Sequence, residues 1–219
     1  MSPDQSFFKS FTDEPNPPIL YIDTTFIVDA IVEGQEHHEK SLEFIEKLAK
    51  DSKTQPIIIY SDLLRIEFRC AIIGICIRNK YDLKDKSIHD LIKAHPDVIK
   101  EFYPEVEEAE KQFQEILQRF VHRTSVEINE DIIKKSGDLM QRYRLGSYDA
   151  VHVATMEFWG IKDIVSYDWS FGDLPKYKPD CKVWSCHGFK KYNDRISKRK
   201  DPAETINKII QEAEAIVET

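Results

Sequence analysis

The chain has 219 residues, of which 41% are hydrophobic and 32% are charged, and its formal net charge at pH 7 is −8. This length and hydrophobic share suffice for one good-sized α/β domain with extensions, or for two small domains. No segment approaches the roughly 20 continuous apolar residues of a membrane span, and the N-terminus lacks the charge-then-apolar order of a signal peptide. We therefore expect a cytoplasmic protein with no membrane partner. The negative charge argues against simple polyanion binding, because nucleic-acid affinity comes largely from Lys and Arg.

The first part of the chain alternates strand-like apolar runs with helical patterns. Residues 1–18 contain four prolines and are expected to form a loosely ordered, flexible arm. The runs at 19–22 and 56–60 predict buried strands, and we expect Thr24 and Ser61 to cap the helices that follow. Strand, helix, strand, helix is the order that builds a parallel sheet. The fold class we expect is α/β, a three-layer α/β/α domain with a central parallel sheet.

The second part is expected to continue this order after a charge-rich stretch. Residues 79–120 show helical periodicity only in parts, and we interpret them as a helical hairpin or insertion. Asn129 and Ser147 are expected to cap two further helices. Apolar runs at 163–166 and 182–185 predict the last two strands.

These elements set the expected domain boundaries. A single domain spans 19–186 and follows the arm. Residues 187–219 are expected to form a basic linker and a C-terminal amphipathic helix that starts near Asp201. This helix needs an apolar partner, which is either its own domain or a second subunit.

Four acidic residues lie where chemistry is expected in such a fold. Asp23 and Asp168 follow strand-like runs, and ligands of an open parallel sheet bind beyond the carboxyl ends of its strands. Glu67 falls on the apolar stripe of its helix, where a lone carboxylate is costly to bury. Asp149 lies in the first turn of a helix, a position that the helix dipole alone would also favour. If the four converge without a cation, at least one should have a raised pKa.

The segments that contain these acids follow one another in a specific order. IleLeuTyrIleAspThrThrPheIleVal contains Asp23, and TyrSerAspLeuLeuArgIleGluPhe contains Glu67. SerTyrAspAlaValHisValAlaThrMet contains Asp149, and IleValSerTyrAspTrpSerPhe contains Asp168. In this order and spacing the four segments resemble the motifs of the PIN domain family, a group of metal-dependent nucleases. The resemblance covers roughly residues 19–186.

The resemblance implies a PIN-like, metal-dependent endoribonuclease with Mg²⁺ or Mn²⁺ as its cofactor. In this interpretation the catalytic residues and the metal ligands are the same set, namely Asp23, Glu67, Asp149 and Asp168. Mg²⁺ and Mn²⁺ are hard cations that prefer oxygen ligands, which agrees with a set of carboxylates. The implied substrate is RNA, and the implied assembly is a homodimer. Many PIN proteins are toxins of toxin-antitoxin modules, and an antitoxin should bind this chain if it is one of them.

The chain departs from the PIN pattern near its last motif. Some members have a further acid where this chain has Ser170, and Asp173 could substitute for it. His152 lies three residues beyond Asp149, and we interpret it as a packed histidine of an apolar helix.

Several further residues are candidates for RNA contacts. The candidates for phosphate contacts are Arg65, Arg69, Arg142, Arg144 and the basic run at 190–200. The candidates for base stacking are Trp169, Trp184 and Tyr192, although such aromatics more often belong to a core. The alternative to a nuclease is a PIN-like module that binds RNA or a protein without cleaving it.

Overall fold

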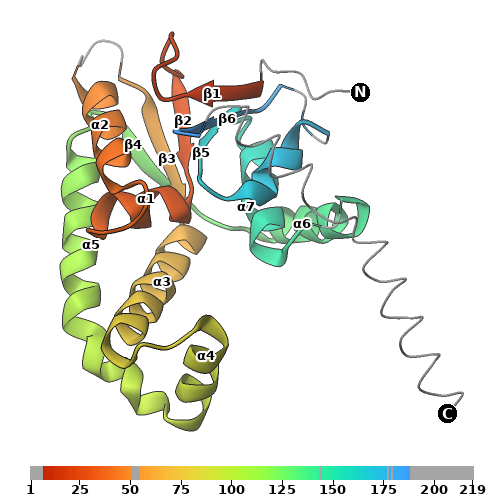
Figure 1. Cartoon of the computed structure of the whole chain (residues 1–219). Coiled ribbons are helices and arrows are strands. Elements are labelled where there is room, and N and C mark those ends of the chain that lie inside the picture. The colour runs from red at the N-terminus through yellow and green to blue at the C-terminus, as the bar shows by residue number, and fades with distance from the viewer. Residues whose placement is uncertain (1–6, 51–54, 144, 177, 179, 188–219) are drawn as a thin grey trace, which may run out of the picture. The chain divides into compact units, whose positions relative to one another are not determined.

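The computed structural model describes residues 7–50, 55–143, 145–176, 178 and 180–187. These residues form a six-stranded, all-parallel sheet with helices on both faces, which confirms the predicted three-layer α/β/α fold (Figure 1). Across the sheet the strands run in the order β1 (Phe8–Ser10), β6 (Lys182–Ser185), β5 (Asp163–Val165), β2 (Ile19–Ile22), β3 (Ile57–Ser61) and β4 (Arg123–Val126).

Helices connect these strands and cover both faces of the sheet (Figure 1). The α-helices of the described part are α1 (Thr24–Ile31), α2 (His38–Ala49), α3 (Asp62–Tyr81), α4 (Asp85–Ala94), α5 (Tyr103–Gln118), α6 (Glu130–Tyr143) and α7 (Ser147–Phe158). Two 3-10 segments are η2 (Pro96–Phe102) and η3 (Trp169–Lys176). None of the helices in the described ranges is long and apolar enough to cross a membrane.

The strands are apolar on both faces because both faces are covered by helices. In β2, Leu20 and Ile22 contribute to a core shared with α1, α2, α3 and α5. Tyr21 points to the opposite face and belongs to a second core with α6 and α7. This alternation follows from the two-residue side-chain period of a strand. The central strand β2 therefore connects the two cores, and its carboxyl end lies between them.

Two predicted caps are confirmed, and both begin helices that follow a strand. The Ser61 hydroxyl accepts a hydrogen bond from the Leu64 amide at the start of α3. The Asn129 side chain does the same for the Ile132 amide at the start of α6. Each bond satisfies an amide that has no partner within its own helix.

Two other predicted caps are wrong. The N-cap of α1 is Asp23, whose carboxylate accepts from the Thr25 amide, so Thr24 is already helical. The N-cap of α7 is Gly146, which has no side chain to donate or accept, and Ser147 is the first residue of that helix. In both cases the residue before the predicted cap has the extended ψ angle of a cap position.

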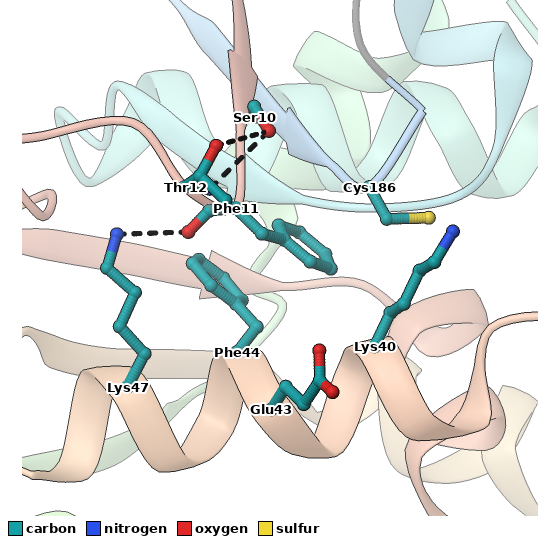
Figure 2. Close-up of a pocket in the computed structure, with 8 residues that line it drawn as sticks. All are labelled: Ser10, Phe11, Thr12, Lys40, Glu43, Phe44, Lys47 and Cys186. Carbon is teal, nitrogen blue, oxygen red and sulfur yellow. Dashed lines mark hydrogen bonds between the residues drawn. The ribbon is translucent and has the colours of Figure 1, made fainter.

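The described part of the arm at 1–18 is more ordered than we expected. Residues 8–10 form β1, which pairs with β6. Phe11 stacks on Phe44 of α2 with ring centroids 4.0 Å apart. The Lys47 ammonium group donates to the carbonyls of Phe11 and Asp13, each at 2.9 Å. These contacts form one wall of a pocket of about 310 Å³ that also reaches Cys186 (Figure 2). Polar composition suggested a loose arm, but two buried phenylalanines tie this segment to the domain. Residues 1–6 lie outside the described residues.

Residues 79–120 are helical and belong to two different cores. Val106 and Phe113 of α5 pack in the main core with α1 and α3. Ile88 of α4 and Phe102 of η2 instead form a small separate cluster with Ile77, in the second half of α3. This cluster, which we call the helical lobe, lies against the part of α3 farther from the sheet (Figure 1). The basic linker and the C-terminal amphipathic helix predicted within 188–219 lie outside the described residues.

Candidate metal centre

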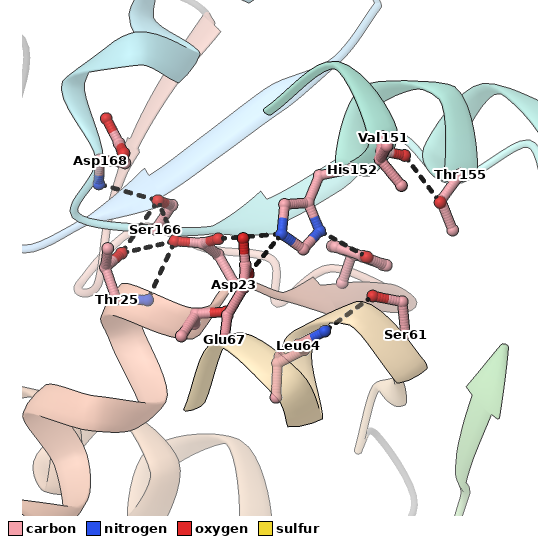
Figure 3. A network of polar contacts seen from close by, with 12 residues as sticks. Asp23, Thr25, Ser61, Leu64, Glu67, Val151, His152, Thr155, Ser166 and Asp168 are labelled. Atoms are coloured by element: carbon pink, nitrogen blue, oxygen red, sulfur yellow. Dashed lines mark hydrogen bonds and ion pairs between the residues drawn. The ribbon is translucent and has the colours of Figure 1, made fainter. Parts of the chain in front are cut away.

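Asp23 is held rigidly by one of its two carboxylate oxygens (Figure 3). Its Oδ2 accepts hydrogen bonds from the Thr25 amide at 3.2 Å, the Thr25 hydroxyl at 2.5 Å and the Ser166 hydroxyl at 2.7 Å. Among the described residues Oδ1 has no hydrogen bond, and its neighbour is the His152 Nε2 at 3.9 Å. Asp23 is only 4% exposed, so this oxygen is a largely desolvated negative group.

Glu67, like Asp23, is held through only one of its two carboxylate oxygens in the described part of the chain. Its Oε2 accepts from the Thr24 hydroxyl at 2.5 Å and pairs with the His152 Nε2 at 2.9 Å. Within the described part of the chain no hydrogen bond is made to Oε1. The inward-facing glutamate thus finds its partners on α1 and α7, and none of them on its own helix. The adjacent residues Thr24 and Thr25 each hold one carboxylate, which fixes Asp23 and Glu67 relative to each other.

Asp149 lies near both Asp168 and Asp23. Asp168 follows β5, and its Oδ1 accepts from the Ser170 amide at 2.7 Å while its own amide donates to Ser166. Burial raises the pKa of Asp149, and the nearby charges of Asp168 and Asp23 raise it further. The predicted repulsion between carboxylates therefore contributes to the raised pKa of Asp149.

His152 contacts the acids of the candidate centre, which the sequence interpretation did not anticipate. It is 2% exposed, and its two ring nitrogens contact the Tyr21 hydroxyl at 2.8 Å and Glu67 at 2.9 Å (Figure 3). Burial alone would lower the pKa of His152, but the hydrogen bond to Glu67 and the charges of Asp23, Glu67 and Asp149 raise it overall. The available signal was its position one turn beyond Asp149, which places both side chains on one face of α7.

The arrangement suits a hard divalent cation. Asp23 and Asp168 follow β2 and β5 at the carboxyl edge of the sheet, and Glu67 and Asp149 lie on α3 and α7. The charges of Asp23 and Asp168 act on Asp149, and those of Asp23, Glu67 and Asp149 act on His152. Carboxylate oxygens are the ligands that Mg²⁺ and Mn²⁺ prefer. Among the described residues, no three of these carboxylates have ligand atoms that all lie within 4.8 Å of one another. A cation bound by all four would therefore need water molecules or small side-chain movements to complete its ligand set.

The structure describes only some of the residues that were predicted to contact RNA. Arg65 and Arg142 are exposed, whereas the Arg69 side chain is paired with Glu110 at 2.6 Å. Trp184 is buried and donates its indole N–H to Asp163 at 2.7 Å, so its prediction as a base-stacking residue is wrong. Trp169 is half-buried. Outside the described residues, or with a side chain outside them, lie Arg144, Asp173, Tyr192 and the run at 190–200.

Several solved structures are similar to this chain. The Mycobacterium tuberculosis toxin VapC20, which cleaves the sarcin-ricin loop, is 12% identical with a TM-score of 0.44, and the match covers 71% of this chain and 94% of that one. A toxin-antitoxin complex from Klebsiella pneumoniae is 16% identical with a TM-score of 0.43, over 78% and 99% of the two chains. VapBC2 from Rickettsia felis, bound to a DNA fragment from its promoter, is 16% identical with a TM-score of 0.44, over 75% and 96%.

The sequence itself identifies the family. No curated protein matches the chain. Residues 20–177 match the PIN domain, and this range includes all four acids of the candidate metal centre. The chain therefore belongs to the PIN domain family.

Proposed function

We propose that this protein is a metal-dependent endoribonuclease that hydrolyses RNA phosphodiester bonds with Mg²⁺ or Mn²⁺ at Asp23, Glu67, Asp149 and Asp168. The supporting observation is the one-sided anchoring of Asp23 and Glu67. In each carboxylate one oxygen takes all the hydrogen bonds found in the described residues, and the other is left for a ligand. A desolvated carboxylate oxygen with no donor is costly unless a cation binds it.

The four acids would have different roles, according to how firmly hydrogen bonds hold each side chain. Asp23 and Glu67 are the fixed ligands, because Thr24, Thr25 and Ser166 hold them in place. Asp149 and Asp168 close the opposite side and hold a water molecule or the phosphate. A divalent cation bound here would activate a water molecule for in-line attack and stabilise the leaving oxygen. Hydrolysis adds that water across one P–O bond of the backbone.

Cleavage of RNA by the pure protein tests this proposal. A panel of structured and single-stranded RNAs is incubated with Mg²⁺ or Mn²⁺, with EDTA in parallel, and with the Asp23→Asn variant as a control. We expect cleavage with metal and a loss of at least about 100-fold in the variant, because Asp23 would be a ligand that the other residues cannot replace. Asp23→Asn preserves the shape of the side chain, so its melting temperature shows whether the fold is intact.

A PIN-like module that binds without cleaving is the competing function. It is favoured if the wild type and Asp23→Asn are equally inert on every RNA while Mn²⁺ fails to raise the melting temperature of the wild type. RNA binding that is identical in both proteins would add to that conclusion.

The expected partners follow from the same proposal. The protein acts as a cytoplasmic homodimer, and an antitoxin binds it if it is the toxin of a pair. Light scattering on the pure protein measures its molar mass, and a dimer gives twice the mass of one chain. Co-expression with a short reading frame that overlaps or abuts the gene tests the antitoxin, which should co-purify with the protein and suppress cleavage.

A further inference from the structure

A line of buried polar groups leads from the second core to the metal centre. Tyr21 is fully buried on β2, and its hydroxyl lies 2.8 Å from the His152 Nδ1. The opposite ring nitrogen, Nε2, lies 2.9 Å from the Glu67 Oε2. The hydroxyls of Ser61 and Thr155 lie beside the Tyr21 hydroxyl. Three elements that are distant in sequence, β2, α7 and α3, are therefore connected through one imidazole ring.

The Tyr21 hydroxyl can pair with Nδ1 in both forms of the His152 ring in which Nε2 bears a hydrogen. Burial raises the pKa of Tyr21, so the group stays a hydroxyl that can donate or accept. When the His152 ring is neutral, donation from Tyr21 to Nδ1 leaves the hydrogen on Nε2. When the ring is protonated, Nδ1 donates to Tyr21 and Nε2 again bears a hydrogen. In both forms Nε2–H is directed at the Glu67 Oε2.

We propose that His152 is a positioning residue of the metal centre, which holds Glu67 so that Oε1 faces the ion, and that Tyr21 fixes His152 in this role. The inference rests on the proposed function, because it assigns a task toward the same cation. His152 and the Thr24 hydroxyl both contact the Glu67 Oε2, so they fix the carboxylate without competing for Oε1. Such an outer contact orients the ligand and increases its affinity for metal.

Substitution of a histidine that only packs in the core would have a different effect from substitution of a positioning residue. A histidine that only fills space needs neither hydrogen bond, and its apolar replacement would affect the melting temperature alone. Here both ring nitrogens of a 2% exposed side chain contact polar atoms, and one of those atoms belongs to a predicted ligand. Substitution of His152 should therefore lower the affinity of the protein for metal only if His152 has the positioning role.

Binding of Mn²⁺ to the full-length protein, measured by the loss of the free-ion signal in electron paramagnetic resonance, tests the inference. Tyr21→Phe is the decisive variant, because it keeps the buried ring and removes only a hydroxyl that does not touch Glu67. His152→Leu removes the donor, and His152→Gln restores an N–H group. We expect about 10-fold or greater loss of Mn²⁺ affinity in Tyr21→Phe and His152→Leu, and partial recovery in His152→Gln.

Tyr167→Phe is the matched control. Tyr167 is half-buried, and its hydroxyl hydrogen-bonds to Ser41 at 2.7 Å, which is not one of the proposed ligands. We expect it to bind Mn²⁺ like the wild type. In cleavage assays the Tyr21→Phe loss should fall on kcat, with KM for RNA unchanged.

The outcomes separate this inference from the proposed function. If the wild type binds Mn²⁺, Asp23→Asn does not, and Tyr21→Phe and His152→Gln both bind like the wild type, the positioning role is wrong while the metal centre stands. An equal loss in Tyr167→Phe and Tyr21→Phe also overturns it. If the wild type itself does not bind Mn²⁺, the metal centre fails and the inference fails with it. Should His152→Leu not fold, Tyr21→Phe and His152→Gln still decide the question.

Discussion

The carboxylates of the candidate centre differ in how many hydrogen-bond donors and how many other negative charges surround them. Three donors converge on one oxygen of Asp23, and two polar groups converge on one oxygen of Glu67. Asp149 instead lies near two other carboxylates, and burial raises its pKa before those charges add to the effect. Without a cation, ionisation of Asp149 therefore opposes folding.

Replacing Asp149 should therefore stabilise the metal-free protein. The pKa of this carboxyl is higher in the folded state than in the unfolded state, so its contribution to stability is complete below about pH 4 and is lost as pH rises through the folded pKa. In EDTA at pH 7 we expect Asp149→Asn to melt a few degrees above the wild type. The difference should vanish below about pH 4, where the wild-type carboxyl is neutral.

The same variant should respond less to metal. Saturating Mn²⁺ is expected to raise the melting temperature of the wild type more than that of Asp149→Asn, because a ligand has been removed. Thermal scans at several pH values, with EDTA or Mn²⁺, measure both effects. A variant that is less stable than the wild type in EDTA at pH 7 would contradict the assigned charge repulsion.

The sequence pointed to the four acids of the candidate centre but not to the hydrogen bonds that hold two of them. Asp23, Glu67, Asp149 and Asp168 could be named because strand ends and apolar helix faces are local patterns. His152 was interpreted as a packed histidine because it lies on an apolar helix, and its polar partners are 131 and 85 residues away along the chain. A single sequence does not reveal which tyrosine of which strand meets that ring.

At the scale of elements, helix starts place the ligands. Asp23 is the N-cap of α1, and Thr24 and Thr25 in its first turn hold Glu67 and Asp23. Asp149 lies in the first turn of α7, where the positive end of the helix dipole favours a carboxylate. A Cβ atom added to the N-cap Gly146 would lie 3.0 Å from the Asp149 Oδ2. The start of α7 thus gives this carboxylate room only because Gly146 has no side chain.

Gly146→Ala should therefore act on Asp149 with little effect on the fold. The φ angle at this position is −57°, which alanine adopts freely, and within the described ranges the only close neighbour of the new atom is the Asp149 side chain. We expect the melting temperature in EDTA to change by no more than a few degrees, whereas Mn²⁺ affinity falls several-fold as the carboxylate shifts. Gly137→Ala on α6 is the control, since no atom of the neighbouring described residues lies within 4 Å of its added Cβ. Equal Mn²⁺ affinity in both variants would show that Asp149 is not a ligand.

Element boundaries were predictable where the pattern was local. Ser61 and Asn129 were named as caps because a polar residue precedes an apolar helical stripe in each case. Strands β1 and β4 were missed: β1 has three residues, and three of the four residues of β4 are exposed, so neither shows an apolar run. Both are edge strands whose existence depends on pairing with a strand far away in sequence.

At the scale of the molecule, the helical lobe and the candidate centre rest on different cores. Phe102 is 4% exposed in the lobe cluster, which contains none of the four acids. Phe102→Ala should cost about 3–5 kcal/mol of lobe packing. We expect amide hydrogens of α4 and η2 to exchange faster in hydrogen-exchange mass spectrometry, with Mn²⁺ affinity unchanged. Faster exchange in β2 and β5 as well would show that the lobe and the sheet unfold as one unit.

The strand order could not be read from the sequence, although the fold class could. Alternation of strands and helices predicts a parallel sheet, but the order β1-β6-β5-β2-β3-β4 depends on pairings between distant segments. The predicted parallel sheet nevertheless placed Asp23 and Asp168 at one edge, because parallel strands all end on the same side. The prediction of a parallel sheet was therefore sufficient to place these two acids at the same edge, even though the neighbours of each strand were not known.

The separation of β2 from its neighbour β5 has a consequence for biosynthesis. Asp23 is held by Ser166, which is 143 residues later in the chain. At a translation rate of about 5–20 residues per second, roughly 7–30 s pass between the synthesis of these two residues. Throughout that interval the nascent chain has no complete centre, although it is attached to a ribosome made largely of RNA. If the proposed ribonuclease activity is present, this chain order delays it until most of the domain has been translated.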